Sequence, residues 1–294
     1  MYSLLEFFDK KNILRIGSFE TLGSAKATHS KNILCYAMTK EYINKANKNI
    51  NISCVITTEV LAKGIKEKAV VIDDEPEITF STLVNEFISK ERLVPLMSFK
   101  VDKSVLIHPT AIVSKKTKIG KNVTIGRHAI IEDYTILDEN VVIGDNVIIG
   151  CEGFYFKRNK SGELVKFLHA GGVHLHKNVE VMTGSMVQRA HDANFTIVEE
   201  GTKISVNVNI GHSTKIGKHN MITGNVQIAG RVQIGDYCWI GTSATISDSV
   251  KIGDHCEIKI GSVVVKKVKD NAVISGNFAM QHSQNLKNYI RAQK

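Results

Sequence analysis

An aliphatic residue recurs at every sixth position over much of this chain, and this period limits the possible folds more than any other feature. Eight such positions run from Ile107 to Ile149, three from Leu175 to Val187, and twelve from Val198 to Val264. A period of six matches neither the 3.6 residues per turn of an α-helix nor the two-residue alternation of a half-buried strand. The chain from Ile107 onward is therefore built from a repeated six-residue unit.

A repeated hexapeptide has a known physical solution. Each unit forms a short flat strand and a turn, and three units close a triangular coil of 18 residues with the aliphatic residues inside. Glycine often follows the aliphatic position, as in IGKNVT, IGDNVI, IGKHNM, IGDYCW and IGDHCE. Glycine, asparagine and aspartate tolerate the backbone conformations that a sharp corner needs. We therefore predict a mainly β protein in which residues 101–268 form a parallel β-helix.

Two insertions interrupt the repeat. Between Ile149 and Leu175 the stretch CEGFYFKRNKSGELVKFLHAGGVH cannot fit the coil, so we expect it to leave the β-helix as a loop. Between Val187 and Val198 the spacing is eleven, one residue short of two repeats. Such insertions fit at the corners of a solenoid, and extruded loops often carry functional sites.

Residues 1–100 lack the six-residue period and are predicted to form a separate small α/β domain. The segments INISCVITTEV and EKAVVIDD are typical of short buried strands. The segments FSTLVNEFISKER and SKNILCYAMTKEYINKAN have helical apolar spacing. After Val264 we expect the coil to stop at KKVKD, leaving residues 269–294 as a tail in which SQNLKNYIRAQK forms a short basic helix.

Composition narrows the classes of function. The five cysteines form no C-x-x-C pair, which argues against a disulfide framework and against a thiolate zinc site. The net charge of +9 favours anionic partners such as a nucleotide-linked substrate or an acidic carrier protein. Nucleic acid is the least favoured partner, because the lysines are scattered and no aromatic residues are interleaved with them. The sequence shows neither a signal peptide nor a membrane span, so we expect a cytoplasmic protein.

His212, in VNVNIGHSTKIG, is the clearest catalytic candidate. It follows Ile210 by two positions, so it lies at a corner with its side chain outside the core. Gly230 follows His212 by eighteen residues, which places it in the adjacent coil and in register. A general base beside an unhindered backbone N–H is what acyl transfer requires, because the first removes a proton from the attacking amine and the second stabilises the oxyanion.

The run from Gly150 to Gly230 resembles the UDP-3-O-acylglucosamine N-acyltransferases of lipid A synthesis, which are hexapeptide-repeat acyltransferases. The family's G-x-D-G-F-G-Y loop and its W-V-K-I-P segment are similar to G-C-E-G-F-Y-F and L-V-K-F-L here. Its N-Q-C-Q-I-A-H-N-V-x-I-G segment is similar to V-N-V-N-I-G-H-S-T-K-I-G, which puts the family's catalytic base on His212. Its oxyanion glycine, in an I-M-A-G context, falls on Gly230. The segment ETLGSAKATHSKNILCYAMTKEY is similar to the family's uridine-binding domain.

The resemblance implies a left-handed β-helix, a homotrimer with sites between neighbouring subunits, and an acyl carrier protein or coenzyme A thioester as donor, with no bound cofactor or metal. The acceptor would be a UDP-amino sugar, UDP-3-O-(3-hydroxyacyl)glucosamine in the family. The implied substrate-binding residues are Phe154, Lys166, Arg189, Asn209, Tyr36 and Tyr42.

Some residues depart from the family's pattern and leave alternatives open. The family's Asp-Asn before the catalytic segment is Ser205-Val206 here, and Gln188 replaces an aspartate beside Arg189. One alternative is therefore transfer of an acetyl or other short acyl group from coenzyme A to a nucleotide-linked amino sugar for surface polysaccharide. Lys266, Lys267 and Lys269 could then meet the phosphates of coenzyme A, or an acidic carrier protein.

A more distant alternative is a non-catalytic or zinc-bearing β-helix. It would use histidines in or near the inserted loops, and the candidates are His169, His174, His176 and His191. The aromatic run Phe154 to Phe156 either lines an acyl or sugar pocket or only packs the loop.

Overall fold

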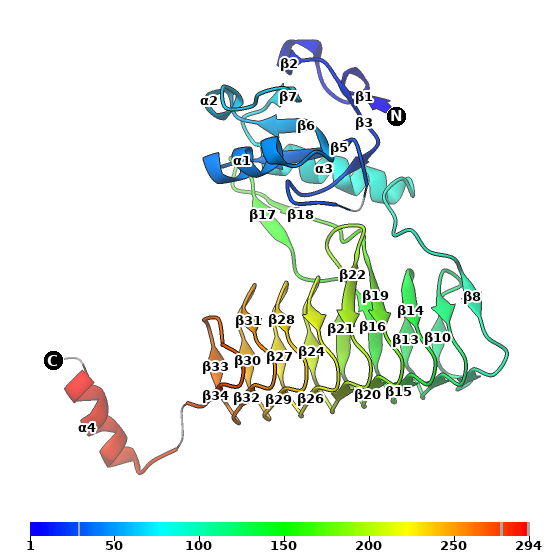
Figure 1. The fold of residues 1–294 in the computed structure, drawn as a ribbon, viewed down its shortest axis with the longest axis vertical. Helices are drawn as coiled ribbons and strands as arrows, with labels where there is room; N and C mark the ends of the chain where they lie inside the picture. The colour runs from blue at the N-terminus through cyan, green and yellow to red at the C-terminus, as the bar shows by residue number, and fades with distance from the viewer. Residues whose placement is uncertain (29, 277–278, 293–294) are drawn as a thin grey trace.

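The computed structural model describes residues 1–28, 30–276 and 279–292 (Figure 1). A small N-terminal domain stands over the middle of a long β-helix. The hairpin of β17 (Phe156–Arg158) and β18 (Leu164–Lys166) reaches up from the β-helix to this domain. The C-terminal helix α4 (His282–Ala292) lies beyond the far end of the β-helix.

Three parallel sheets form the sides of the β-helix, as the six-residue period predicts. We number its faces in chain order. The first face, of eight strands, contains β8 (Lys100–Val101), β11 (Lys118–Ile119), β14 (Thr135–Leu137), β19 (Gly172–Leu175), β22 (Phe195–Val198), β25 (Lys215–Ile216), β28 (Gln233–Ile234) and β31 (Lys251–Ile252). The second, of nine, contains β9 (Leu106–Ile107), β12 (Thr124–Ile125), β15 (Val142–Ile143), β20 (Glu180–Val181), β23 (Lys203–Ile204), β26 (Met221–Ile222), β29 (Trp239–Ile240), β32 (Glu257–Ile258) and β34 (Val273–Ile274). The third, of eight, contains β10 (Ile112–Val113), β13 (Ile130–Ile131), β16 (Ile148–Cys151), β21 (Met186–Gln188), β24 (Asn209–Ile210), β27 (Gln227–Ile228), β30 (Thr245–Ile246) and β33 (Val263–Val264).

The aliphatic residues of the ladder fill the inside of this prism. From Ile119 to Val264 every one of them is buried, whereas Ile107 at the open end is 40% exposed. Corner residues adopt positive φ angles, and at one corner Asn122 donates to Asn140 (3.2 Å) and Asn140 to Asn178 (3.1 Å). The predicted left-handed parallel β-helix is confirmed, and its core is a continuous aliphatic column.

The β-helix continues past the point where the sequence predicts its end. Val268 bridges to Ile252, and Ile274 pairs with Ile258, so one further strand follows KKVKD. Val268 follows Val264 by four residues instead of six. The expected stop at residue 268 is therefore wrong, because the final corner is two residues short and the period disappears from the sequence there.

The N-terminal domain contains a five-stranded sheet in the order β2-β7-β6-β5-β4. Its strands are β2 (Ile13–Arg15), β4 (Thr21–Leu22), β5 (Ile33–Ala37), β6 (Ile52–Thr57) and β7 (Ala69–Ile72), with a separate pair β1 (Tyr2–Ser3) and β3 (Ser18–Phe19). Its helices are α1 (Lys40–Lys48), α2 (Glu59–Ala62) and α3 (Pro76–Ser89), with 3-10 turns at Leu4–Glu6 and Lys10–Asn12.

One of the predicted helices of this domain is partly wrong. The segment SKNILCYAMTKEYINKAN is not one helix, because its first half forms the strand β5 and only its second half forms α1. Ile33, Leu34, Cys35 and Ala37 are all fully buried. A strand that is buried on both faces reads as a continuous apolar run, which periodicity cannot distinguish from a buried helix.

Both insertions leave the β-helix at the same edge, where the third face turns into the first. The first insertion separates β16 from β19 and contains the antiparallel hairpin β17 (Phe156–Arg158) and β18 (Leu164–Lys166). The second insertion separates β21 from β22, which belong to neighbouring faces. Its spacing of eleven residues is therefore one repeat of six plus five inserted residues. It is not two repeats with one residue missing, as the sequence suggested. His212, which follows β24, lies at the same edge.

Asn85 on α3 ties the N-terminal domain to the first insertion. Its amide nitrogen donates to the carbonyl of Lys166 (2.7 Å), and its amide oxygen accepts from the backbone N–H of Leu168 (2.9 Å). Among the residues placed by the structure, no helix is both long and apolar enough to cross a membrane.

Candidate active site

A cavity of about 290 Å³ lies between the N-terminal domain and the edge of the β-helix that carries the insertions. Its lining combines residues of the α/β domain with residues from both insertions and from two coils. They are Leu22, Gly23, Ser24, Ala25, Lys26, Tyr36, Tyr42, Phe80, Val84, Leu93, Tyr155, His191, Asp192, Ser213 and Arg231.

The imidazole of His212 lies against Gly230 of the next coil, beside this cavity. A β-carbon built on Gly230 would lie 2.5 Å from Nε2 of His212 and 2.8 Å from its Cε1. Arg231 N–H donates to the carbonyl of His212 (2.8 Å), which fixes the two coils in register. The eighteen-residue spacing therefore brings these two residues together, and the absence of a side chain on Gly230 makes room for the ring.

The backbone N–H two residues after a ladder position donates a hydrogen bond at only some corners of the β-helix. At Arg127, Lys218 and Asp254 the corresponding N–H donates to an aspartate side chain of the following coil. The aspartate one coil beyond Gly230 is Asp248, whose carboxylate binds Arg231 (2.7 Å). Within the described part of the chain, the Gly230 N–H donates no hydrogen bond, so no protein acceptor competes for it.

Three histidines from separate segments lie together here, namely His169, His191 and His212. The ring centroid of His169, from the first insertion, lies 5.1 Å from that of His212, and the ring of His191, from the second, lies 6.3 Å from it. Tyr155 packs edge-on against His191 (4.7 Å) and parallel to His212 (6.4 Å). His169 Nδ1 lies 3.3 Å from Glu152 Oε2. The two insertions thus enclose the ring of His212.

This enclosure changes the acid–base properties of the cluster. Burial, followed by the charges of His169 and Arg231, lowers the pKa of His212 to about 4. Burial and the neighbouring His169 and His212 lower the pKa of His191 to about 3. Nδ1 of His212 and Nε2 of His169 are buried and have no hydrogen-bond partner among the described residues. Both His191 and His212 are therefore neutral at physiological pH, and His212 is in the form that accepts a proton.

The residues that directly follow His212 and Gly230 in the sequence both line the cavity. Ser213 comes directly after His212 and accepts the backbone N–H of His191 (2.9 Å), which ties the second insertion to this coil. Arg231 comes directly after Gly230 and is held by Asp248 and by Ser249 Oγ (3.2 Å). A fixed guanidinium at the cavity wall suits an anionic ligand.

Tyr36 and Tyr42, the two tyrosines expected to bind substrate, both line the cavity. The hydroxyl of Tyr36 donates to Glu77 on α3 (3.0 Å), and burial together with Tyr155 and Glu77 raises its pKa. Tyr42 on α1 is 40% exposed, and Lys45 Nζ lies 4.7 Å from the centre of its ring.

The other four expected substrate-binding residues do not line the cavity. Phe154 is 85% exposed and packs against Phe156, while Lys166 is exposed on β18. Arg189 donates to the carbonyl of Gly150 (2.6 Å), which anchors the first insertion. Asn209 accepts from Gln188 (3.4 Å), whose side-chain oxygen accepts the N–H of His212 (3.2 Å). Arg189 and Asn209 thus support the site from outside the cavity.

The structure also separates the histidines considered for a zinc site. His169 and His191 join His212, whereas His174 and His176 lie together on the first face of the β-helix. Lys266, Lys267 and Lys269 are exposed near the end of the β-helix.

Sequence reasoning missed Arg231, Ser213 and Asp248 as site residues. A signal was present for Asp248, which follows Gly230 by eighteen residues and so lies one coil on from a candidate. Ser213 and Arg231 directly follow the candidates His212 and Gly230 in the sequence. The clustering of Tyr155, His169 and His191 had no such signal, since each comes from an insertion outside the period.

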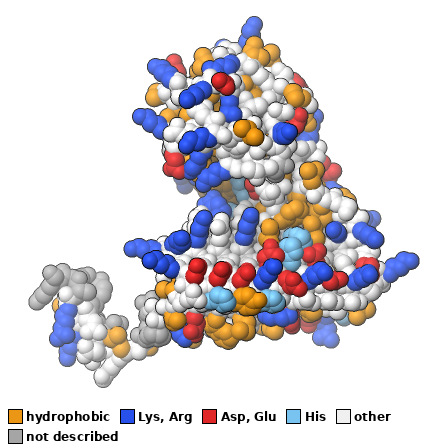
Figure 2. Space-filling model, viewed as in Figure 1, with side chains coloured by type: hydrophobic (Ala, Val, Ile, Leu, Met, Phe, Trp, Pro, Cys, Tyr) orange, Lys and Arg blue, Asp and Glu red, His pale blue; other side chains and the backbone are white. Residues whose placement is uncertain are grey.

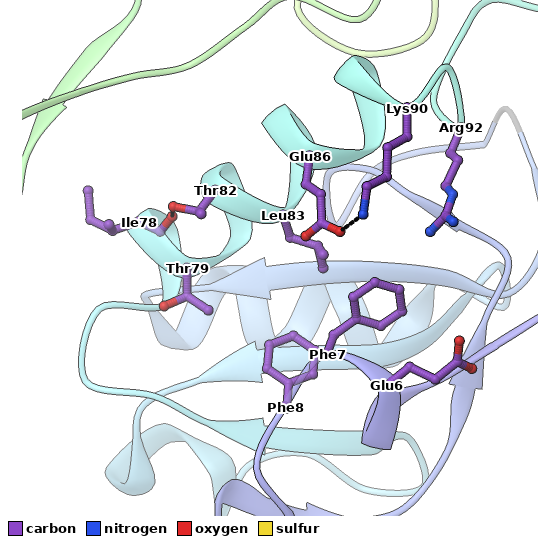
Figure 3. Close-up of a pocket in the computed structure, with 10 residues that line it drawn as sticks. All are labelled: Glu6, Phe7, Phe8, Ile78, Thr79, Thr82, Leu83, Glu86, Lys90 and Arg92. Atoms are coloured by element: carbon purple, nitrogen blue, oxygen red, sulfur yellow. Dashed lines mark hydrogen bonds and ion pairs between the residues drawn. The ribbon is translucent and has the colours of Figure 1, made fainter.

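A second hollow, of about 530 Å³, lies on the N-terminal domain between α3 and residues 6–8 (Figure 3). An ion pair between Glu86 and Lys90 crosses one side of it. It contains none of the expected site residues, so the first cavity remains the candidate active site.

Comparison with known proteins agrees with the repeat architecture. Residues 231–266 match the family model described as bacterial transferase hexapeptide (six repeats). The UDP-3-O-acylglucosamine N-acyltransferase of Helicobacter pylori is 37% identical over 73 residues, which cover 25% of this chain and 21% of that protein. Its namesake from Campylobacter jejuni subsp. doylei is 40% identical over 74 residues, which cover 25% and 23%. The chain thus matches between a fifth and a quarter of the length of these relatives.

Among solved structures, the UDP-N-acetylglucosamine acyltransferase of Campylobacter jejuni superposes with a TM-score of 0.48 at 23% identity, covering 65% of this chain and 77% of that one. The match of residues 231–266 and the three stacked parallel sheets identify the chain as a hexapeptide-repeat β-helix protein, and a quarter of it is similar in sequence to the UDP-3-O-acylglucosamine N-acyltransferases.

Proposed function

We propose that this protein is an N-acyltransferase that moves an acyl group from a carrier thioester to the amine of a nucleotide-linked amino sugar. As the acceptor we propose UDP-3-O-(3-hydroxyacyl)glucosamine, an intermediate of lipid A synthesis, because the relatives are named UDP-3-O-acylglucosamine N-acyltransferases. The observation that carries this proposal is the neutral imidazole of His212 packed against Gly230, whose N–H has no acceptor among the described residues.

The pair can carry out each step of the reaction. The sugar amine attacks the thioester carbonyl, and a new C–N bond forms while His212 takes a proton from the nitrogen. The Gly230 N–H donates a hydrogen bond to the oxyanion of the tetrahedral intermediate. The intermediate collapses, the C–S bond breaks, and the thiolate takes the proton back from the imidazolium. The lowered pKa of His212 keeps the imidazole unprotonated at neutral pH, so it can accept this proton.

The cavity supports a nucleotide-linked acceptor. Arg231 and Lys26 bring positive charge to its wall, which suits a diphosphate, and Tyr36 and Tyr42 offer aromatic surface to a base. In this proposal the N-terminal domain, residues 1–100, holds the nucleotide, and residues 101 onward hold the reacting groups. The sugar would then lie over Ser213, within reach of His212.

We further propose that the protein works in the cytoplasm as a homotrimer, with the carrier thioester entering between neighbouring β-helices. His212 and both insertions lie along one edge of the prism. A neighbouring prism beside this edge would supply a second wall for the acyl chain.

A thioester-consumption assay tests the proposal and selects the donor. The purified chain is incubated with UDP-amino sugars and with either a 3-hydroxyacyl carrier protein or acetyl-coenzyme A, and free thiol is measured. Turnover with the carrier protein alone supports the lipid A reaction, and turnover with acetyl-coenzyme A alone supports the short-acyl alternative. Binding of UDP-amino sugars without turnover of either donor would refute an acyltransferase.

A further inference from the structure

A second cluster of polar side chains lies on the first face of the β-helix, away from the cavity. Asp138 follows β14, His176 follows β19 and Glu199 follows β22, so these three residues occupy the same position in three consecutive coils. Their backbone N–H groups each donate to the next coil at 2.9 Å, which fixes the column. His174, within β19, completes the cluster. Figure 2 shows histidine side chains flanked by acidic ones on the visible face of the β-helix.

The coils on either side lack these groups. At the same corner position the preceding coil has Gly120 and the following coil has Gly217, and glycine is the residue that the hexapeptide pattern favours there. The polar column therefore replaces glycine in three consecutive coils between Gly120 and Gly217, which is a local departure from the repeat.

Three atoms of the cluster converge on one point. His174 Nε2 and His176 Nδ1 lie 3.1 Å and 3.2 Å from the same oxygen, Oδ2 of Asp138. The two imidazole rings stack with centroids 3.9 Å apart. Around a tetrahedral ion with bonds of ~2.0–2.1 Å, neighbouring ligand atoms are roughly 3.3 Å apart. The spacing of these three atoms therefore fits one transition-metal ion, and all of them lie within 4.8 Å of one another.

Glu199 completes the arrangement from outside. Its Oε2 lies 3.6 Å from Nε2 of His176, the ring nitrogen that points away from Asp138. Metal-binding histidines commonly direct their second nitrogen at a carboxylate, which fixes the tautomer and orients the ring. With a metal on Nδ1, the Nε2–H of His176 would point to Glu199, and both nitrogens would have a partner.

We propose that Asp138, His174 and His176 hold a divalent transition-metal ion such as Zn²⁺, with Glu199 orienting His176 and a water in the fourth position. All ligands come from one chain, in contrast to a zinc site shared between subunits. Two imidazoles and one carboxylate form a donor set that zinc accepts, and a three-ligand site keeps one position open.

The position of the cluster indicates what the ion would do. His174 lies in the first strand after the long insertion and His176 directly follows that strand, while Glu199 follows the first strand after the short insertion. In these coils the insertions lengthen the separation of paired residues beyond the usual 18 positions. Leu137 pairs with Leu175, 38 positions on, and Leu175 pairs with Val198, 23 positions on. A metal would clamp the coils where the insertions interrupt the repeat, and so hold the loops that carry His169 and His191.

Metal binding by the untagged full-length chain tests this inference. After dialysis against a chelator, Zn²⁺ is titrated against the protein with a chromophoric competitor, and Co²⁺ is added separately to record its visible spectrum. We expect one tight ion per chain and an intense Co²⁺ band typical of tetrahedral coordination. Wild-type protein that binds no ion tightly, or binds only weakly at several sites, would overturn the proposal.

Variants assign the ion to this cluster. His176→Asn and Asp138→Asn should weaken Zn²⁺ binding by at least about 100-fold, and Glu199→Gln by about 10–100-fold. His219→Asn and His255→Asn, at corners of later coils, are matched controls that should bind as wild type does. His212→Asn should also bind normally, and its failure to bind would place the ion in the active-site cluster instead.

Thermal unfolding keeps the test decisive if a variant is less stable. Zn²⁺ should raise the melting temperature of the wild type and of His255→Asn, but not that of His176→Asn. An equal rise in all three would show that the ion binds elsewhere, whatever the starting stability of each variant.

Discussion

The imidazole of His212 lies directly against Gly230 of the following coil, so closely that a β-carbon on Gly230 would stand 2.5 Å from Nε2. Two residues eighteen positions apart thus share a space that admits only one side chain.

Replacing Gly230 with alanine should block the reaction while leaving the fold intact. The added methyl group would push the His212 ring away and shield the backbone N–H, and loss of an oxyanion donor costs about 10²–10³ in kcat. The measurement is kcat in the thioester assay. Gly224→Ala is the matched control, because its β-carbon would meet only ordinary contacts with Val206 at 3.5 Å. Equal activity of the two variants would contradict the role of Gly230.

His212→Asn should lower kcat by about 10²–10⁴, the usual contribution of a general base. KM for the nucleotide-linked sugar should change little, because the cavity lining comes mainly from other residues. His219→Asn is the control, since His219 lies at a corner two residues before the exposed Met221 and outside the cavity. Near-normal turnover by the His212 variant would exclude it as the base.

Arg231→Gln should raise KM for the nucleotide-linked substrate by about 10- to 100-fold and change kcat less. A guanidinium held by Asp248 is placed to contact phosphate, and loss of one charge-assisted contact is worth roughly 1.5–3 kcal/mol. Arg127→Gln removes an exposed arginine that also faces an aspartate, Asp145 (3.9 Å), and should have no effect. Steady-state kinetics with varied sugar nucleotide measures both. An unchanged KM would remove Arg231 from the binding site.

Acid should destabilise the protein through the histidine cluster. The pKa of His191 is about 3 in the folded chain, against roughly 6.5 when unfolded. The unfolded chain therefore binds more protons between these values, and the free energy of unfolding falls as the pH drops from about 6.5 to about 3. Burial also lowers the pKa of His212, to about 4, so His212 likewise makes the free energy of unfolding fall as the pH drops.

Urea unfolding at pH 7 and pH 4.5 measures this effect. In His191→Gln the loss of stability between the two pH values should be smaller than in the wild type, by on the order of 2 kcal/mol. The His255→Gln control should keep the dependence of the wild type. If the free energy of unfolding of the wild type does not fall when the pH is lowered from 7 to 4.5, these histidines are not enclosed in solution.

Asn85→Ala should loosen the contact between the N-terminal domain and the first insertion. Its amide both donates to the carbonyl of Lys166 and accepts the N–H of Leu168. In the variant the Lys166 carbonyl and the Leu168 N–H lose the Asn85 side chain as a hydrogen-bond partner. Loss of a hydrogen bond to a buried group lowers the free energy of unfolding by about 1–3 kcal/mol. Limited proteolysis should cut within residues 152–170 faster than in the wild type, whereas Asn47→Ala, within the domain itself, should leave this cleavage rate unchanged.

The sequence alone determined the β-helix and much of its register. A period of six admits one main packing solution, so Ile119 and each later ladder residue up to Val264 could be assigned to the core. The same period placed His212 beside Gly230, because residues one coil apart must be adjacent. The pattern failed where the period changed, at the last corner before Val268, and where a strand buried on both faces resembled a helix, at Ile33 to Ala37.

Only the tertiary structure decided how the inserted segments complete the sites. Tyr155, His169 and His191 come from segments without periodicity, and their positions depend on packing against the N-terminal domain. The structure also divided the histidines into two groups, one around His212 and one around Asp138. A regular repeat makes neighbours predictable from spacing, whereas a loop's position depends on long-range contacts that no local pattern encodes.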